Sequence, residues 1–79
     1  MKAVQYSADA LNALRKHRKD ADAIMAKIDR YAATGAGDVK PLVGRVGKRL
    51  RVGDYRVLFE EDATTLLVSN IGPRGAVYD

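Results

Sequence analysis

Cysteine is absent from this sequence of 79 residues, and histidine occurs once. Without cysteine the chain forms no disulfide and no thiolate metal site, and the single histidine, His17, does not suffice for an ordinary zinc centre. We therefore expect no metal and no other cofactor. A reducing compartment suits a chain without cysteine. Because we also find no signal peptide and no apolar run long enough to span a membrane, we expect a cytoplasmic protein.

The length predicts one domain over residues 1–79. A domain of this size buries only about 60% of the surface that its unfolded chain exposes, so a binding partner is a natural further source of stability. The formal net charge is +4, from 14 Lys and Arg and 10 Asp and Glu. This sign favours an acidic partner, either nucleic acid or an acidic protein. A solvated, mildly basic surface gives the same value, so the placement of the charges has to decide.

The first half of the chain predicts one strand and two helices. Residues 2–6 are typical of a short strand, and Ser7 is suited to cap the helix that follows. A second helix starts at Asp20 or Asp22, and its apolar residues have the spacing of one buried face. Residues 34–38 stop it, so the two helices should form an antiparallel hairpin. The apolar residues of the second helix are Ala21, Ile24, Met25, Ile28, Tyr31 and Ala32.

In the second half of the chain the apolar period changes from 3.6 to 2, which predicts strands over residues 45–52, 55–61 and 64–71. Gly53 and Asp54 form a two-residue turn of the hairpin type. The element order is therefore β-α-α-β-β-β. It predicts the α+β class, with a helical hairpin packed on one face of a small, curved, mainly antiparallel sheet.

The turn at Gly53 and Asp54 also fixes the register of the hairpin. It places Arg51 opposite Arg56, and Arg49 shares their face because it lies two residues before Arg51. We call this side of the sheet the arginine face. The opposite face should form the core, with Leu50, Val52, Tyr55, Val57, Phe59, Leu66 and Val68.

Neighbouring guanidinium groups on the arginine face repel one another. A like-charge pair across two strands is destabilising, within the roughly 0.2–1 kcal/mol range of such pairs. An anionic ligand would relieve this cost, and the planar guanidinium fork suits phosphate. The alternative is that the arginine side chains splay into water or reach Glu60. Lys40 and Lys48 can add to the basic surface, but Lys48 has the wrong strand parity for the arginine face.

Two further candidates lie in the tail. Gly72 and Pro73 turn the chain as the last predicted strand ends, and Arg74 follows at the rim of the arginine face. Tyr78 is the penultimate residue. A terminal tyrosine is either a packing plug or, beside arginines, a group that stacks on a base or takes part in proton transfer.

The chain resembles the RelE/ParE superfamily of toxins from type II toxin–antitoxin pairs, and the resemblance covers nearly its whole length. Residues 48–60 (KRLRVGDYRVLFE) are similar to the basic strand, turn, Tyr-Arg and apolar strand of the family. Residues 71–78 (IGPRGAVY) are similar to its Gly-x-Arg and near-terminal Val-Tyr. The resemblance to the RelE-like branch implies a ribosome-dependent endoribonuclease. Such an enzyme cleaves mRNA by attack of a ribose 2′-hydroxyl on the adjacent phosphate, without metal.

The resemblance also implies a role for each matching residue. Arg49 takes the place of a basic residue that helps to deprotonate the 2′-hydroxyl or holds the transition state. Arg51 is a neighbouring phosphate contact, and Arg56 binds the scissile phosphate. Arg74 stabilises the transition state or donates a proton to the leaving group. Tyr78 stacks on the base or orients it.

Arg45, Lys48 and Arg51 complete the predicted set of RNA- and phosphate-binding residues. The sequence departs from the family where Gly47 stands in place of a lysine that many members have. Arginine is also a poor base, because its pKa is above about 12. The identity of the general base therefore stays open.

The implied partners are a cognate antitoxin protein, the ribosome and mRNA, and no membrane. Two other functions share the fold. One is a ParE-like inhibitor of DNA gyrase, which has no need of a nuclease site. The other is a non-catalytic module that only binds an antitoxin.

Overall fold

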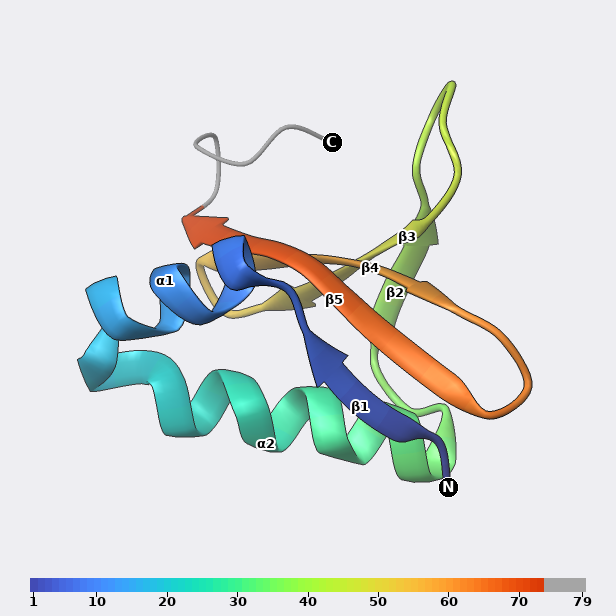
Figure 1. The fold of residues 1–79 in the computed structure, drawn as a ribbon, viewed down its shortest axis with the longest axis horizontal. Helices are drawn as coiled ribbons and strands as arrows, with labels where there is room; N and C mark the ends of the chain where they lie inside the picture. The colour runs from blue at the N-terminus through green and yellow to red at the C-terminus, as the bar shows by residue number, and fades with distance from the viewer. Residues whose placement is uncertain (74–79) are drawn as a thin grey trace.

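The computed structural model describes residues 1–73, in which two helices lie on one side of a five-stranded sheet (Figure 1). The strand order is β1-β5-β4-β3-β2; β1 pairs with β5 in parallel, and the other pairs are antiparallel. The predicted α+β class and the helical hairpin on one sheet face are confirmed. The elements are β1 (Ala3–Tyr6), α1 (Ala8–Lys16), α2 (Arg18–Thr34), β2 (Asp38–Pro41), β3 (Lys48–Val52), β4 (Tyr55–Glu61) and β5 (Thr65–Pro73).

Local signals fix the ends of the helices. The Oγ atom of Ser7 accepts a hydrogen bond from the Ala10 N–H at 3.0 Å, which caps α1 as expected. His17 is the only residue between the two helices, so α2 begins at Arg18, earlier than the predicted Asp20 or Asp22. Gly35 ends α2 in the left-handed conformation, with a φ of 76°.

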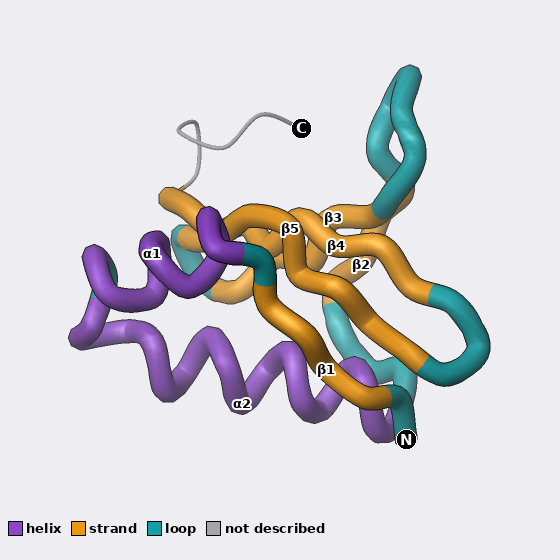
Figure 2. Tube along the Cα trace, viewed as in Figure 1, coloured by secondary structure: helices purple, strands orange, loops and turns teal. Residues whose placement is uncertain are grey.

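The predicted register of the β3–β4 hairpin is confirmed. Arg51 lies opposite Arg56, and Arg49 lies opposite Leu58. The strand predicted over 45–52 begins only at Lys48, because Gly44 and Gly47 have φ values of 74° and 117° and belong to a loop. Loop 42–47 stands away from the sheet on the side opposite the helices (Figure 2).

The strand β2 is an addition to the predicted element order. It forms one edge of the sheet and pairs with β3, so that Asp38 lies opposite Arg51 and Lys40 lies opposite Arg49. Gly37 allows this approach, because a Cβ atom at that position would lie 2.9 Å from Leu50 Cδ1. The edge strand therefore adds the side chains of Asp38 and Lys40 to the arginine face.

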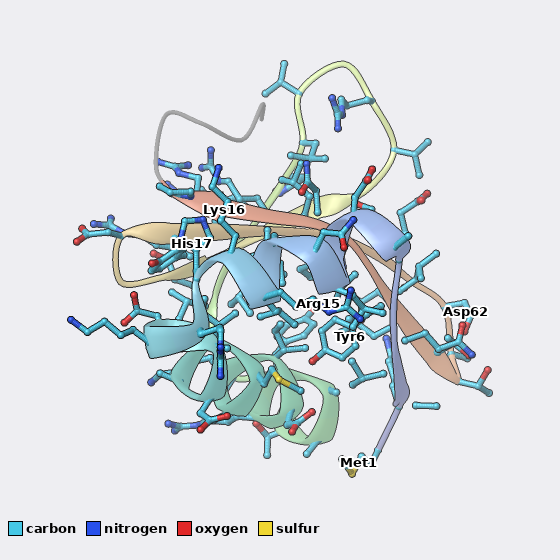
Figure 3. All side chains as sticks on the ribbon, turned by 60° about the vertical axis from the view of Figure 1, so that its left-hand side comes forward. Met1, Tyr6, Arg15, Lys16, His17 and Asp62 are labelled. Atoms are coloured by element: carbon cyan, nitrogen blue, oxygen red, sulfur yellow. The ribbon has the colours of Figure 1, made fainter. Side chains whose placement is uncertain are left out.

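The hydrophobic core lies between the helices and the sheet, and it contains the core residues predicted on the strands except Tyr55. Tyr55 is only partly buried and packs against the core. Tyr6 points from β1 toward the helices (Figure 3), and its buried hydroxyl has no hydrogen-bond partner among the described residues. The buried core consists of Ala10, Leu14, Ile24, Ile28, Ala32, Leu50, Val52, Val57, Phe59, Leu66, Val68 and Ile71.

Neither α1 nor α2, the helices of the described part of the chain, has the length and apolar character needed to cross a membrane.

Candidate phosphate-binding site

The arginine face carries two rows of side chains that run across β2, β3 and β4. The first row is Asp38, Arg51 and Arg56, each directly opposite the next. The second row contains Lys40 opposite Arg49. Directly opposed residues share a sheet face, so these five side chains project together on the side away from the helices.

These five side chains line one hollow of about 110 Å³, which we call the arginine hollow. It is larger than the roughly 30 Å³ that one molecule occupies in liquid water, so an anion can replace solvent in it. Four of the lining side chains are cationic and one is anionic at neutral pH. A concave surface with this charge balance attracts phosphate groups.

The side chains that line the arginine hollow differ in how far they are exposed to solvent. Lys40 and Arg51 are exposed, whereas Arg49 and Arg56 are half-buried. Arg51 Nε donates a hydrogen bond to the Gly53 carbonyl at 3.5 Å, which holds the side chain toward the hairpin turn. The half-buried guanidinium groups are screened less by water, so they act more strongly on a bound anion.

Leu58 is an apolar residue on the arginine face of the sheet. It lies opposite Arg49 in the register, between the core residues Val57 and Phe59, and so points away from the helices. It is nevertheless only 3% exposed. Arg49 therefore has a buried apolar side chain directly opposite it on β4.

Comparison with solved structures gives matches over nearly the whole chain. A point variant of YafQ from E. coli has a TM-score of 0.80 at 13% identity and covers 100% of both chains. The RelBE2 toxin–antitoxin complex from Mycobacterium tuberculosis gives 0.75 at 23% identity, covering 92% of this chain and 98% of that chain. The archaeal RelE–RelB complex from Pyrococcus horikoshii gives 0.75 at 21% identity, covering 96% and 98%. The chain has the RelE-like fold. No protein-family model and no curated protein sequence matches it.

Lys48 lies outside the arginine hollow of this RelE-like fold. Its Nζ donates a hydrogen bond to Glu61 Oε2 at 2.9 Å, on the sheet face that the helices cover. The strand parity predicted for Lys48 is right, and its membership of the phosphate-binding set is not supported by this position. Lys2 Nζ forms a second ion pair with Glu61, and the Tyr31 hydroxyl donates to Glu61 Oε2 at 2.6 Å.

The contacts of Glu61 shift several pKa values. Burial by itself raises the pKa of Glu61, but the hydrogen bonds from Lys2, Tyr31 and Lys48 outweigh burial and lower the pKa to about 2. The hydrogen bond to Glu61 raises the pKa of Lys48. Burial, followed by the same carboxylate, raises the pKa of Tyr31. This cluster ties α2 and the residue before β1 to the strands β3 and β4.

The other sequence candidates lie in different places. Arg45 is exposed in loop 42–47, which the Leu42 N–H closes by donating to the Gly47 carbonyl at 3.1 Å. Arg74 and Tyr78 lie outside the described residues.

His17 lies at the junction of the helices (Figure 3), where its ring makes an edge contact with Tyr55 at a centroid distance of 5.2 Å. Within residues 1–73, no three His, Asp or Glu side chains gather as metal ligands.

Asp38 is the lining residue that sequence reasoning did not select, and Lys40 was considered only as part of a general basic surface. Both depend on β2, a four-residue strand that contains Pro41 and lacks apolar alternation. Once β2 is paired with β3, strand parity alone places Asp38 and Lys40 on the arginine face.

Proposed function

We propose that this chain is the toxin of a toxin–antitoxin pair and that it cleaves mRNA on the ribosome. One observation carries the proposal: three arginines from two adjacent strands line one hollow on the sheet face that points away from α1 and α2. The RelE-like fold supports the same function, since the matching structures are of RelE and YafQ toxins and their complexes. The absence of cysteine suits action in the cytoplasm.

The proposed reaction is attack of a ribose 2′-hydroxyl on the adjacent phosphate. Negative charge builds up on the phosphoryl oxygens as phosphorus becomes pentacoordinate, and fixed cations stabilise that charge. Arg56 and Arg49 are half-buried and therefore best suited to this role. Arg51 is a further phosphate contact at the rim. Following the family resemblance, Arg74 assists the leaving group and Tyr78 orients the base.

The proposed partners are the ribosome, mRNA and an antitoxin. Structures with the same fold include complexes of RelE with RelB from Pyrococcus horikoshii and Methanococcus jannaschii. An antitoxin that blocks an arginine-lined site is expected to place acidic side chains against it. We therefore expect the cognate antitoxin to compete with RNA for the arginine hollow.

The test is primer extension on mRNA from cells that express the chain, together with cleavage of mRNA in a translating extract. We expect discrete cuts with the wild type and a loss on the order of 10²–10³ in rate for Arg56→Ala. Arg74→Ala should show a loss of similar size. Arg30→Ala removes an exposed arginine of α2, on the opposite side of the molecule, and should cut like the wild type.

Circular dichroism and thermal unfolding of each variant separate loss of chemistry from loss of fold. Uncut mRNA with the folded wild-type protein would refute the nuclease proposal. Inhibition of supercoiling by purified gyrase under the same conditions would instead assign the chain to the ParE-like function. Equal cutting by the wild type and Arg56→Ala would show that the arginine hollow is not the active site.

A further inference from the structure

Among the described residues, Asp38 is the one anionic group that lines the arginine hollow. It lies directly opposite Arg51, in the row that continues to Arg56. A carboxylate at this place repels a phosphate and so weakens binding of the ligand that the four cations favour. Its presence in the hollow therefore calls for a role other than affinity.

A purely structural role for Asp38 would be to neutralise Arg51. Among residues 1–73, however, the ion pairs are those of Glu61 with Lys2 and Lys48, and Asp38 takes part in neither. Arg51 instead donates its Nε–H to the Gly53 carbonyl. The exposed carboxylate of Asp38 is thus left available to a ligand.

The chemistry of the other lining groups limits which of them can accept a proton. The charged groups that face Asp38 are Lys40 from its own strand, Arg49 and Arg51 from β3, and Arg56 from β4. All four are cationic side chains that donate hydrogen bonds and have no free lone pair to accept a proton. Attack by a 2′-hydroxyl needs a proton acceptor close to the phosphate. Of the side chains that line the hollow within residues 1–73, the Asp38 carboxylate alone meets this requirement.

We propose that Asp38 is the general base of the ribonuclease reaction, an inference that rests on the function proposed above. The Asp38 carboxylate takes the proton of the 2′-hydroxyl as the 2′-oxygen forms its bond to phosphorus. The bond from phosphorus to the 5′-oxygen breaks, and the 5′-oxygen takes a proton from water. The products are a 2′,3′-cyclic phosphate and a 5′-hydroxyl, and Asp38 returns its proton to the solvent.

The place of Asp38 is built into the fold. Gly37 lets the chain pass close to the core residue Leu50, because a Cβ atom on residue 37 would lie only 2.9 Å from Leu50 Cδ1. The pairing of β2 with β3 then sets the direction of the next side chain. An edge strand brought in by this close passage places a base beside cations that come from the neighbouring strands.

The experiment measures single-turnover cleavage on ribosomes programmed with mRNA, for the wild type, Asp38→Asn and Asp38→Ala. We expect the rate to fall by at least about 10²-fold in both variants. Affinity for a 2′-O-methyl mRNA that cannot be cut should stay equal or increase, because a negative charge has been removed. Added formate, a small carboxylate base, should restore part of the rate to Asp38→Ala but none to Arg56→Ala. Asp22→Ala, which removes an exposed aspartate of α2, should behave as the wild type.

The outcomes are distinguishable. If the folded wild type does not cut, the proposed function fails, and the role of Asp38 fails with it. If the wild type cuts and Asp38→Asn cuts at the same rate, Asp38 is not the base. If both variants lose rate together with affinity for the 2′-O-methyl mRNA, and formate restores nothing, Asp38 only positions its neighbours and the proposal is overturned. Asparagine has nearly the same shape as aspartate, so Asp38→Asn still tests the proposal if Asp38→Ala misfolds.

Discussion

Arg51 lies directly opposite Arg56 across the β3–β4 hairpin, and both side chains line the arginine hollow. Two cations at directly opposed positions of a sheet destabilise the fold in the absence of a ligand. An anion that lies between the two guanidinium groups would offset this repulsion.

A double-mutant cycle of Arg51→Gln and Arg56→Gln isolates this pairwise interaction from all other contacts of the two residues. In urea unfolding at low salt we expect the pair to be repulsive by about 0.2–1 kcal/mol. Inorganic phosphate should reduce the repulsion more than sodium chloride of equal ionic strength, since phosphate bridges the pair and chloride only screens it. An attractive coupling without phosphate would contradict a net repulsion between Arg51 and Arg56.

Because of Glu61, the free energy of unfolding should depend on pH under acidic conditions. Its pKa of about 2 in the folded protein lies below the roughly 4.3 of a glutamate in an unfolded chain. The contacts of its carboxylate therefore stabilise the fold fully above about pH 5, and this contribution is lost as the pH falls toward 2. We expect Glu61→Gln to lower the free energy of unfolding at pH 7 by about 1–3 kcal/mol. In urea unfolding between pH 7 and pH 2.5, the difference from the wild type should shrink with acidification.

Glu60→Gln is the matched control for this measurement, because Glu60 is the exposed neighbour on the same strand. It should shift stability little at any pH. A difference between the wild type and Glu61→Gln that stayed constant down to pH 2.5 would show that Glu61 stabilises by packing alone.

Gly37→Ala tests the close approach of β2 to the core. The added Cβ would lie 2.9 Å from Leu50 Cδ1, so the buried side chain or the strand must move. We expect a loss of about 1–3 kcal/mol in the free energy of unfolding, as for other overpacked sites. Because the clash is with Leu50, the loss should be smaller in a Leu50→Ala background. An equal loss in both backgrounds would place the cost in the backbone at Gly37 instead.

The hairpin that carries the arginines could be predicted from the sequence because its determinants are local. Gly53 and Asp54 form a two-residue turn, and every cross-strand partner follows from it by counting. The same counting places Lys48 opposite Phe59 and thus near Glu61, two residues further along β4. This ion pair could have been predicted as a diagonal neighbour.

The strand β2 could not be predicted in the same way. Residues 38–41 lack apolar alternation, and only their pairing with β3 makes them a strand. Asp38 and Lys40 were therefore missing from the predicted arginine face. The contacts of Glu61 with Lys2 and Tyr31 join β4 to α2 and to the residue before β1, and no local pattern in the sequence brings these three residues together.

The parallel pairing of β1 with β5 sets Val4 beside Leu66, two positions far apart in the sequence. A nascent polypeptide that has emerged only through β4 has no sheet partner for its first strand, and long-range pairing of this kind delays folding. The complete sheet forms only after residues 65–73 have left the exit tunnel. If the folded protein attacks translation, this order of events protects the ribosome that is making it.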